Sequence, residues 1–442
     1  MSNLGVGLSM FGGMLVLMAL RVPIAVTMFM PGALGYVVLA SPDALLNYMK
    51  GFAYARLSGY DLSVIPLFLL MGQFATQGGL SRALFALANT LIGHLRGGMA
   101  MAAVLASAAF GSICGSSVAT AATVTQVALP EMRRHRYSGR LATATLAAGG
   151  TLGILIPPSV PLVVYGILTQ QNIAKLFAAA FIPGFIAAGL YLAVIAIYVR
   201  VHPDHAPMSA KHSPAEMLAA VRGVWPIAAI FLLMFGGIYG GLFTPIEGAA
   251  IGAASTLASG ILEGELDWQA IKRCFYGTAE TTGMIFMIFL GADMLNAALA
   301  LSQMPEQMAQ TVAASGLPPI VVIVGILLFY VLLSSVMDEL AMILLTIPIV
   351  FPAVMGLELF GLDPTGKAIW FGILVLCVVE IGLIAPPVGL NVYVVNSFAK
   401  DVPMTETYKG ILPFLAADIV RVGLLISLPS LSLWLVGVLT TV

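Results

Sequence analysis

Long runs of apolar residues recur along the whole chain and are separated by short polar segments. A helix that crosses a bilayer needs about 20 such residues. We therefore predict an all-α polytopic membrane protein. The runs place its spanning helices at 5–20, 22–40, 63–79, 139–168, 174–199, 223–241, 243–262, 280–298, 368–397 and 410–440.

Two further apolar stretches, 98–130 and 317–355, are too long for one span and have polar residues at their centres. Each is typical of a re-entrant helical hairpin, which enters the membrane, turns at a buried tip and leaves on the same side. Irregular backbone at that depth is tolerated only inside protein or beside a water-filled cavity. The residues at the two tips are therefore candidate functional residues.

The basic residues orient these helices. If the N-terminus lies outside the cell, only four of the 19 Lys and Arg residues fall on the outer side, Lys50, Arg56, Lys175 and Lys367, and the other 15 fall on the cytoplasmic side. This strong positive-inside bias predicts that both termini are periplasmic. The N-terminal MSNLGVGLSM has no basic residue before its apolar run, so it does not predict a cleaved signal peptide.

Composition excludes several classes of protein. Hydrophobic residues make up 60% of the chain and charged residues 9%, with a net charge of -1, which argues against a nucleic-acid partner. The three cysteines, Cys114, Cys274 and Cys377, are too far apart to predict a disulfide framework or a zinc site. GLDPTGKA at 361–368 has the spacing of a phosphate loop, but it lacks the Ser or Thr that would bind magnesium. No enzyme is predicted.

An internal repeat is the most informative feature. RVPIA at 21–25 matches FTPIE at 243–247, the SSV at 116–118 recurs at 334–336, and GILIPPSV at 153–160 recurs as GLIAPPVG at 382–389. We predict two repeats, each with five spans and one hairpin. An odd number of spans inverts the second repeat, and inverted repeats with a site at their interface are a transporter design. The domains are then 1–199, a cytoplasmic linker at 200–222, and 223–442.

The hairpin and proline segments suggest ion and anion sites. GSICGSSVATAATV at 111–124 offers carbonyl and hydroxyl oxygens without fixed charge, which suit sodium. The paired prolines of 153–158 and 382–387 interrupt a helix and so free carbonyls and a half-helix N-terminus in mid-membrane. Such elements can hold a cation and an anionic substrate.

Several acidic residues allow both a functional and a structural interpretation. Burying the carboxylate of Asp338, in the second tip, inside a membrane costs free energy, and such a residue usually marks an ion site. Alternatively, Asp338 and Glu339 only begin the descending helix as an acidic first turn. Glu380 either belongs to the site or hydrogen-bonds a neighbouring helix. Asp418 and Arg421 are one helical turn apart, and we expect them to pair.

At this point the sequence resembles a known family. IPLFLLMGQFATQGG at 65–79, GHLRGGMAMAAVLASAAFGSICGSSVATAATV at 93–124 and GTLGILIPPSVPLVVYG at 150–166 are similar to the DctM-type large membrane subunit of tripartite ATP-independent periplasmic (TRAP) transporters. The resemblance runs from about residue 5 to the C-terminus. It implies a bacterial inner-membrane permease that takes up organic acids, such as C4-dicarboxylates, keto acids or sialic acid, with the sodium gradient and no organic cofactor.

The resemblance also implies a mechanism and partners. In this elevator mechanism, a transport unit of both hairpins and both broken helices, 139–168 and 368–397, slides against a scaffold of the remaining spans. A periplasmic solute-binding protein delivers the substrate, and a small four-helix membrane subunit braces the scaffold. Because the chain begins directly at the repeat, we expect that subunit to be a separate polypeptide.

Site residues follow from the resemblance by position. The first sodium site would comprise Ser116, Ser117 and Gly153. The second would comprise Ser334, Asp338 and Gly382. The substrate would lie between the tips, near Thr120, Pro157, Pro158, Pro386, Pro387 and Asn391. The second tip reads SSVMDELAM and lacks the glycines of the first, which leaves its turn and its ion site open.

The amphipathic segment 80–96 is typical of an interfacial helix, here an arm that braces the first hairpin, with 300–315 as its counterpart. The alternative is an ordinary connecting helix. Rival functions are a stand-alone sodium–dicarboxylate symporter of the divalent-anion family, which needs no binding protein, and a channel, against which two occluding tips argue. A membrane-embedded enzyme would need a nucleophile–base pair or metal ligands at depth, and no histidine or cysteine is placed for that.

Overall fold

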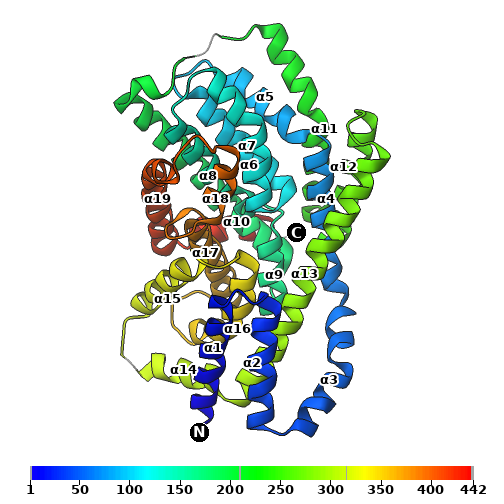
Figure 1. Ribbon diagram of the computed structural model, residues 1–442, viewed down its shortest axis with the longest axis vertical. Helices are drawn as coiled ribbons and strands as arrows, with labels where there is room; N and C mark the ends of the chain where they lie inside the picture. The colour runs from blue at the N-terminus through cyan, green and yellow to red at the C-terminus, as the bar shows by residue number, and fades with distance from the viewer. Residues whose placement is uncertain (1, 209–210, 315, 440–442) are drawn as a thin grey trace.

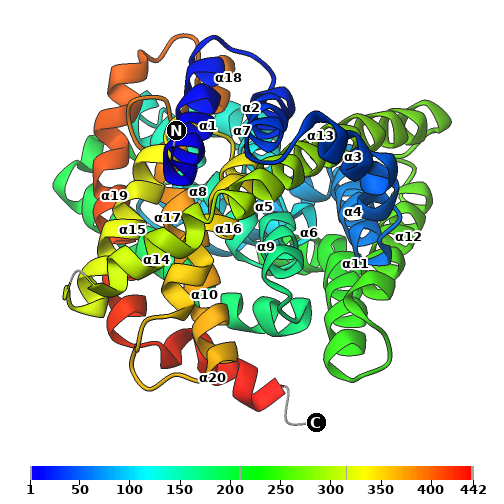
Figure 2. The same cartoon turned by 90° about the horizontal axis from the view of Figure 1, so that it is seen from below.

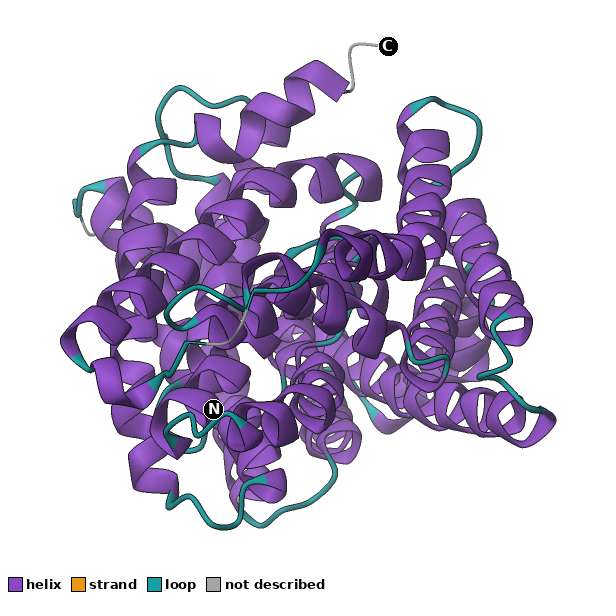
Figure 3. Cartoon of the chain, turned by 90° about the horizontal axis from the view of Figure 1, so that it is seen from above, coloured by secondary structure: helices purple, strands orange, loops and turns teal. Residues whose placement is uncertain are grey.

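The computed structural model describes residues 2–208, 211–314 and 316–439 (Figure 1). Every regular element in these residues is a helix (Figure 3). Six helices among them are long and apolar enough to cross a membrane, or seven if α3 and α4, which meet at 51°, form one bent span. Several predicted spans are shorter than expected: α2 has 16 residues and covers about 24 Å, less than the apolar core of a bilayer.

The first half of the chain contains α1 (Asn3–Ala19), α2 (Ile24–Leu39), α3 (Pro42–Leu57), η1 (Tyr60–Ser63), α4 (Val64–Gln77), α5 (Leu80–Ile92), α6 (Gly98–Cys114), α7 (Ser117–Arg134), α8 (Gly139–Leu155), α9 (Val160–Thr169), α10 (Ile173–Val201) and η2 (Pro203–His205). The second half contains α11 (Pro214–Tyr239), α12 (Pro245–Leu262), α13 (Trp268–Leu301), α14 (Met304–Ala314), α15 (Pro319–Ser334), α16 (Glu339–Met355), α17 (Pro364–Ile384), α18 (Leu390–Phe398), α19 (Met404–Ser427) and α20 (Ser430–Leu439).

Both predicted hairpins are pairs of helices, α6–α7 and α15–α16. In Figure 1 the first pair lies in the upper half of the molecule and the second in the lower half, so the two tips approach each other from opposite ends. The two predicted broken helices are α8–α9 and α17–α18, each interrupted at its proline pair. The two helices predicted as arms lie against the hairpins: α5 packs on α6, and α14 packs on α16 (Figure 2).

Three predicted boundaries differ from the structure. The single span at 410–440 is wrong, because α19 ends where Leu428 leaves the helical conformation, and Pro429 disfavours that conformation in the residue before it. α11 begins at Pro214, inside the predicted linker, because Ser213 and Glu216 form a capping box there. α13 extends over 34 residues, well beyond the predicted 280–298, whereas its counterpart in the first half is bent between α3 and α4.

The first parts of the two broken helices form the core. α17 is buried along nearly its whole length, as expected for a helix that is apolar on every side. α8 is equally buried, and its many Gly, Ala and Thr residues let neighbours approach closely. α6, α7, α10 and α19 pack directly on α8, and α15 packs on α17. A second layer of α1, α2, α4, α12 and α13 covers one side of this assembly (Figure 1).

Candidate functional site

The first hairpin turns on one glycine. α6 ends at Cys114, Gly115 takes a left-handed conformation with φ 66°, and the extended Ser116 caps α7. The backbone N–H of Val160, at the start of α9, donates to the Gly115 carbonyl at 3.5 Å. The turn is therefore joined to the far side of the break in helix α8–α9.

Three groups converge beside this turn. A Cβ on Gly153 would lie 2.8 Å from the Ser116 carbonyl oxygen and would also collide with the Thr120 side chain, so only glycine fits. The Thr120 hydroxyl is fully buried, and no nitrogen or oxygen of the described residues hydrogen-bonds it. The structure thus brings together Ser116 and Gly153, two of the three residues expected at the first sodium site, while the hydroxyl of the third, Ser117, donates to Glu339. Thr120, which was expected to contact the substrate, lies beside Ser116 and Gly153.

The second hairpin turns without glycine. No residue between Ser334 and Asp338 has a positive φ, so the longer sequence SSVMD closes the turn with ordinary backbone angles. The Gly389 N–H donates to the Ser335 carbonyl at 3.4 Å, which repeats the contact between tip and broken helix seen in the first half. A Cβ on Gly382 would lie 2.5 Å from the Ser334 Cβ, so this pair also meets at close range.

The two acidic residues of the second tip have different roles. The Asp338 carboxylate accepts the backbone N–H groups of Leu340 at 3.1 Å and Ala341 at 3.4 Å, so it caps α16, as the alternative reading predicted. Glu339 instead reaches the first hairpin, where its Oε2 accepts the Ser117 hydroxyl at 2.9 Å. Sequence reasoning did not include Glu339 in the site, and the only signal for it was an acidic residue at a buried tip.

The two proline breaks differ in exposure. Pro157 and Pro158 are buried, whereas Pro386 and Pro387 are exposed, and both Pro–Pro bonds are cis. Asn391 is fully buried on α18, and its Nδ2 donates to the Ala147 carbonyl of α8 at 3.4 Å. Apart from Thr120 on α7, the predicted substrate residues therefore lie at or next to the two breaks, and Asn391 links the second broken helix to the first.

A buried ionic network lies next to these elements. Arg421 on α19 pairs with Glu380 on α17 at 2.7 Å and with Asp418 at 3.0 Å. Tyr191 on α10 donates its hydroxyl to Asp418 at 2.8 Å. The expected Asp418–Arg421 pair is confirmed. Of the two interpretations of Glu380, the structure shows the contact with a neighbouring helix, because Glu380 pairs with Arg421 of α19.

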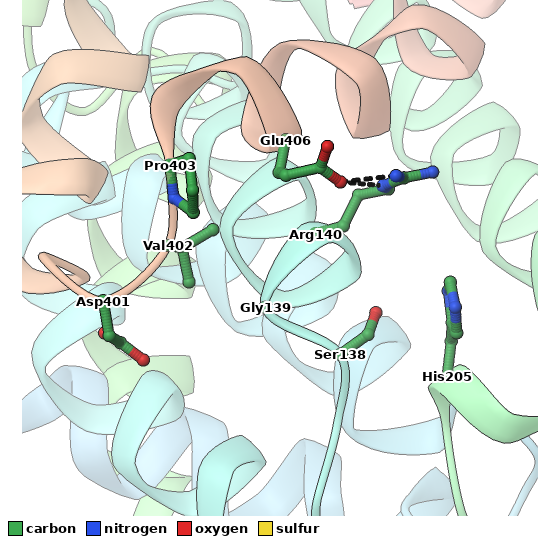
Figure 4. A pocket seen from close by; sticks show the side chains of 8 residues that line it. All are labelled: Ser138, Gly139, Arg140, His205, Asp401, Val402, Pro403 and Glu406. Carbon is green, nitrogen blue, oxygen red and sulfur yellow. Dashed lines mark hydrogen bonds and ion pairs between the residues drawn. The ribbon is translucent and has the colours of Figure 1, made fainter.

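A cavity of about 410 Å³ lies at the N-terminal ends of α8 and α19 (Figure 4). Arg140 donates two hydrogen bonds to Glu406 across it, and the Ser138 N–H donates to the His205 carbonyl at 2.9 Å. Burial, followed by the nearby His202 and Arg140, lowers the pKa of His205. None of the predicted site residues lines this cavity. The cavity lies between His205, at the start of the predicted linker, and the first residues of α8.

The phosphate-loop spacing at 361–368 has a structural explanation. Asp363 caps α17, and the buried Lys367 ammonium donates to the carbonyls of Met355 at 2.9 Å and Leu357 at 2.5 Å, at the end of α16. Within the described part of the chain, no group of three His, Cys, Asp or Glu side chains is arranged to hold a metal ion.

Comparison with protein families identifies the chain. The family model described as "Tripartite ATP-independent periplasmic transporter, DctM component" matches residues 11–431. The chain belongs to the DctM family. The resemblance drawn from the sequence is thereby confirmed, and the chain is a multi-pass transport permease rather than an enzyme.

Curated DctM relatives match over most of their length. The chain is 35% identical over 400 residues to the C4-dicarboxylate TRAP transporter large permease protein DctM of Pseudomonas aeruginosa, covering 90% of this chain and 91% of that protein. It is 29% identical to the isethionate TRAP transporter permease protein DctMQ of Oleidesulfovibrio alaskensis, covering 97% of this chain and 66% of the relative. Among solved structures, the YdaH transporter of Alcanivorax borkumensis shares the fold, with a TM-score of 0.59 and 15% identity over 88% of this chain and 89% of that one.

Proposed function

We propose that this chain is the large permease subunit of a sodium-coupled importer of organic acids that depends on a binding protein. It would lie in the bacterial inner membrane with both termini periplasmic. The observation that carries the proposal is the pairing of two hairpin tips, each held against a broken helix by the same type of backbone contact, from Val160 to Gly115 and from Gly389 to Ser335. Relatives named for C4-dicarboxylate and isethionate support an organic acid as the cargo.

Sodium is the coupling ion in this proposal. Its first site would use the Ser116 carbonyl and the Thr120 hydroxyl beside Gly153, because neutral oxygens at close range suit a singly charged hard cation. The buried Thr120 oxygen supports this choice, because the sulfur of Cys114 is a weak partner and no nitrogen or oxygen of the described residues hydrogen-bonds the hydroxyl. The second site would lie beside Ser334 and Gly382, where Asp338 adds negative charge.

The proposed domains are two inverted repeats, 1–199 and 223–442, whose hairpins approach from opposite ends (Figure 1). In an elevator mechanism the moving unit would contain both hairpins and both broken helices. The buried network of Glu380, Asp418, Arg421 and Tyr191 requires a change to the expected division. Separating these charges inside the membrane would be very costly, so we assign α10 and α19 to the moving unit rather than to the scaffold.

The scaffold would then comprise α1, α2, α4, α11, α12 and α13. Large apolar side chains are exposed on it, among them Leu34 and Val38 on α2 and Leu232 on α11. We propose that the small four-helix subunit and lipid cover such surfaces. A periplasmic solute-binding protein would deliver the organic acid to the permease.

Uptake into proteoliposomes tests the proposal. Vesicles would contain this chain and its small subunit, with radiolabelled succinate or isethionate presented by the binding protein. We expect uptake to be lost when either sodium or the binding protein is omitted. Uptake without the binding protein would instead support the stand-alone symporter of the divalent-anion family, and uptake indifferent to sodium would remove the ion sites proposed above.

A further inference from the structure

Two helices begin at the point where the hairpin tips meet. Ser117 is the first residue of α7, and Glu339 is the first residue of α16. Their caps, Ser116 and Asp338, already accept N–H groups of their own helices. Helix N-termini carry partial positive charge, so two such ends face one another here.

The Glu339 carboxylate occupies this meeting point. It accepts the Ser117 hydroxyl at 2.9 Å, and the two residues are 6% and 0% exposed. No ion pair of the described residues includes Glu339, although Glu380 and Asp418 both pair with Arg421. The Ser117 hydroxyl is thus the one hydrogen-bond donor that the described residues give this carboxylate, and rotation about the Glu339 side-chain bonds breaks that single contact without movement of the backbone.

We propose that Glu339 is an internal competitor for the substrate's carboxylate. In the empty permease its side chain fills the anion position between the tips, and the carboxylate of an arriving organic acid displaces it and takes over the Ser117 hydroxyl. The proposal rests on the proposed function, because it requires an organic acid to bind between the tips. It adds a specificity-determining residue that lies outside the sodium sites.

The charge of Glu339 distinguishes this role from a structural one. A competitor loses its effect when the charge is removed, so both Glu339→Gln and Glu339→Ala would let the acid bind more tightly. If Glu339 only joins the two tips, Gln would replace it, because the amide oxygen still accepts the Ser117 hydroxyl, and only Ala would change binding.

Thermal stabilisation of the purified permease and small subunit by succinate or isethionate, at saturating sodium, tests this. We expect half-maximal stabilisation at about three- to tenfold lower acid concentration in both Glu339 variants, a change of the size that helix-end electrostatics produces. Glu358→Gln removes the same charge from an exposed residue at the other end of α16 and serves as the matched control, with no change expected.

Three results would overturn the proposal: unchanged half-maximal concentrations in both variants, an effect of Ala that Gln does not share, or failure of either acid to stabilise any of these proteins. The uptake assay described above decides the proposed function separately, so sodium-dependent uptake with unchanged binding in the variants would reject only the competitor. Glu339→Asp provides a second route if the Gln variant does not assemble. It keeps the charge but is too short to reach Ser117, so a competitor leaves the half-maximal concentration near that of the wild type, whereas a purely structural contact would make Asp behave like Ala.

Discussion

Arg421 on α19 lies 2.7 Å from Glu380 on α17, and neither side chain has any exposed surface. The same guanidinium also pairs with Asp418, so one positive charge serves two carboxylates inside the membrane. This network fixes α17 to α19, and through Tyr191 to α10. It defines which helices must move together if the permease works as an elevator.

Removing the guanidinium should therefore damage the fold. We expect Arg421→Gln to lose roughly 3–5 kcal/mol of stability, because it leaves two buried carboxylates without a positive partner. Thermal unfolding of the purified protein measures the effect. The triple change Glu380→Gln, Asp418→Asn and Arg421→Gln should recover part of the loss, and a single Arg421→Gln variant that melts like the wild type would contradict this account.

Tyr191→Phe should have a smaller effect on the same network. It removes the hydroxyl that donates to Asp418 at 2.8 Å, and losing a hydrogen bond to a buried charged group costs about 1.5–3 kcal/mol. The melting temperature should fall while the protein still assembles. A comparison with Tyr276→Phe, whose exposed side chain lies on α13, gives the background effect of losing a hydroxyl.

Gly153→Ala should weaken sodium binding. Its Cβ would lie 2.8 Å from the Ser116 carbonyl and collide with Thr120, so both proposed ligands must shift. We expect the sodium concentration for half-maximal stabilisation or uptake to rise at least about tenfold, or about 1.4 kcal/mol. Gly189→Ala on α10 is the matched control, because an added Cβ there meets nothing within 4 Å. Equal sodium dependence in the two variants would exclude Gly153 from an ion site.

Acid should loosen the start of the linker. The pKa of His205 is lowered in the folded protein, so folding favours the neutral imidazole. The stability that this preference contributes is fully present above the unfolded pKa of about 6.5. It is lost as the pH falls from there through the lower pKa of the folded state. Hydrogen exchange of residues 202–206, corrected for intrinsic rates, should be faster at pH 5 than at pH 7.5. His205→Gln should remove this dependence and His94→Gln should retain it; equal exchange at both pH values in the wild type would refute the idea.

Lys367→Met should destabilise the junction of α16 and α17. The ammonium donates to two carbonyls at the end of α16, and leaving buried carbonyls unpaired costs about 1–3 kcal/mol. The melting temperature should fall, and ATP with magnesium should shift neither the wild type nor the variant. A shift with ATP in the wild type alone would restore the phosphate-loop reading of 361–368.

Much of the framework could be predicted from local sequence. The proline pairs at 157–158 and 386–387 and the polar tips inside apolar runs indicated the breaks and turns, because these patterns act within a few residues. The Asp418–Arg421 pair was also predictable, since one helical turn separates them. Pro429 carried a signal for the break between α19 and α20 that the apolar pattern alone concealed.

The contacts between the repeats could not be predicted in this way. Ser117 and Glu339 are 222 residues apart, and their meeting depends on how two hairpins are placed in space. A single sequence gives the chemistry of each tip but no information on which side chains face across. For the same reason, the family resemblance placed Ser117 in the first sodium site without indicating that its hydroxyl donates to Glu339.

The unequal exposure of the two proline breaks offers a way to follow the protein at work. A thiol reagent in the surrounding water should reach a cysteine placed at Pro386, while one placed at the buried Pro157 should be protected. The ratio of the two labelling rates is a reporter that does not depend on knowing the cargo. Recording it with and without a sodium gradient, in intact cells and in inverted vesicles, would reveal from which compartment each break is accessible and when that changes.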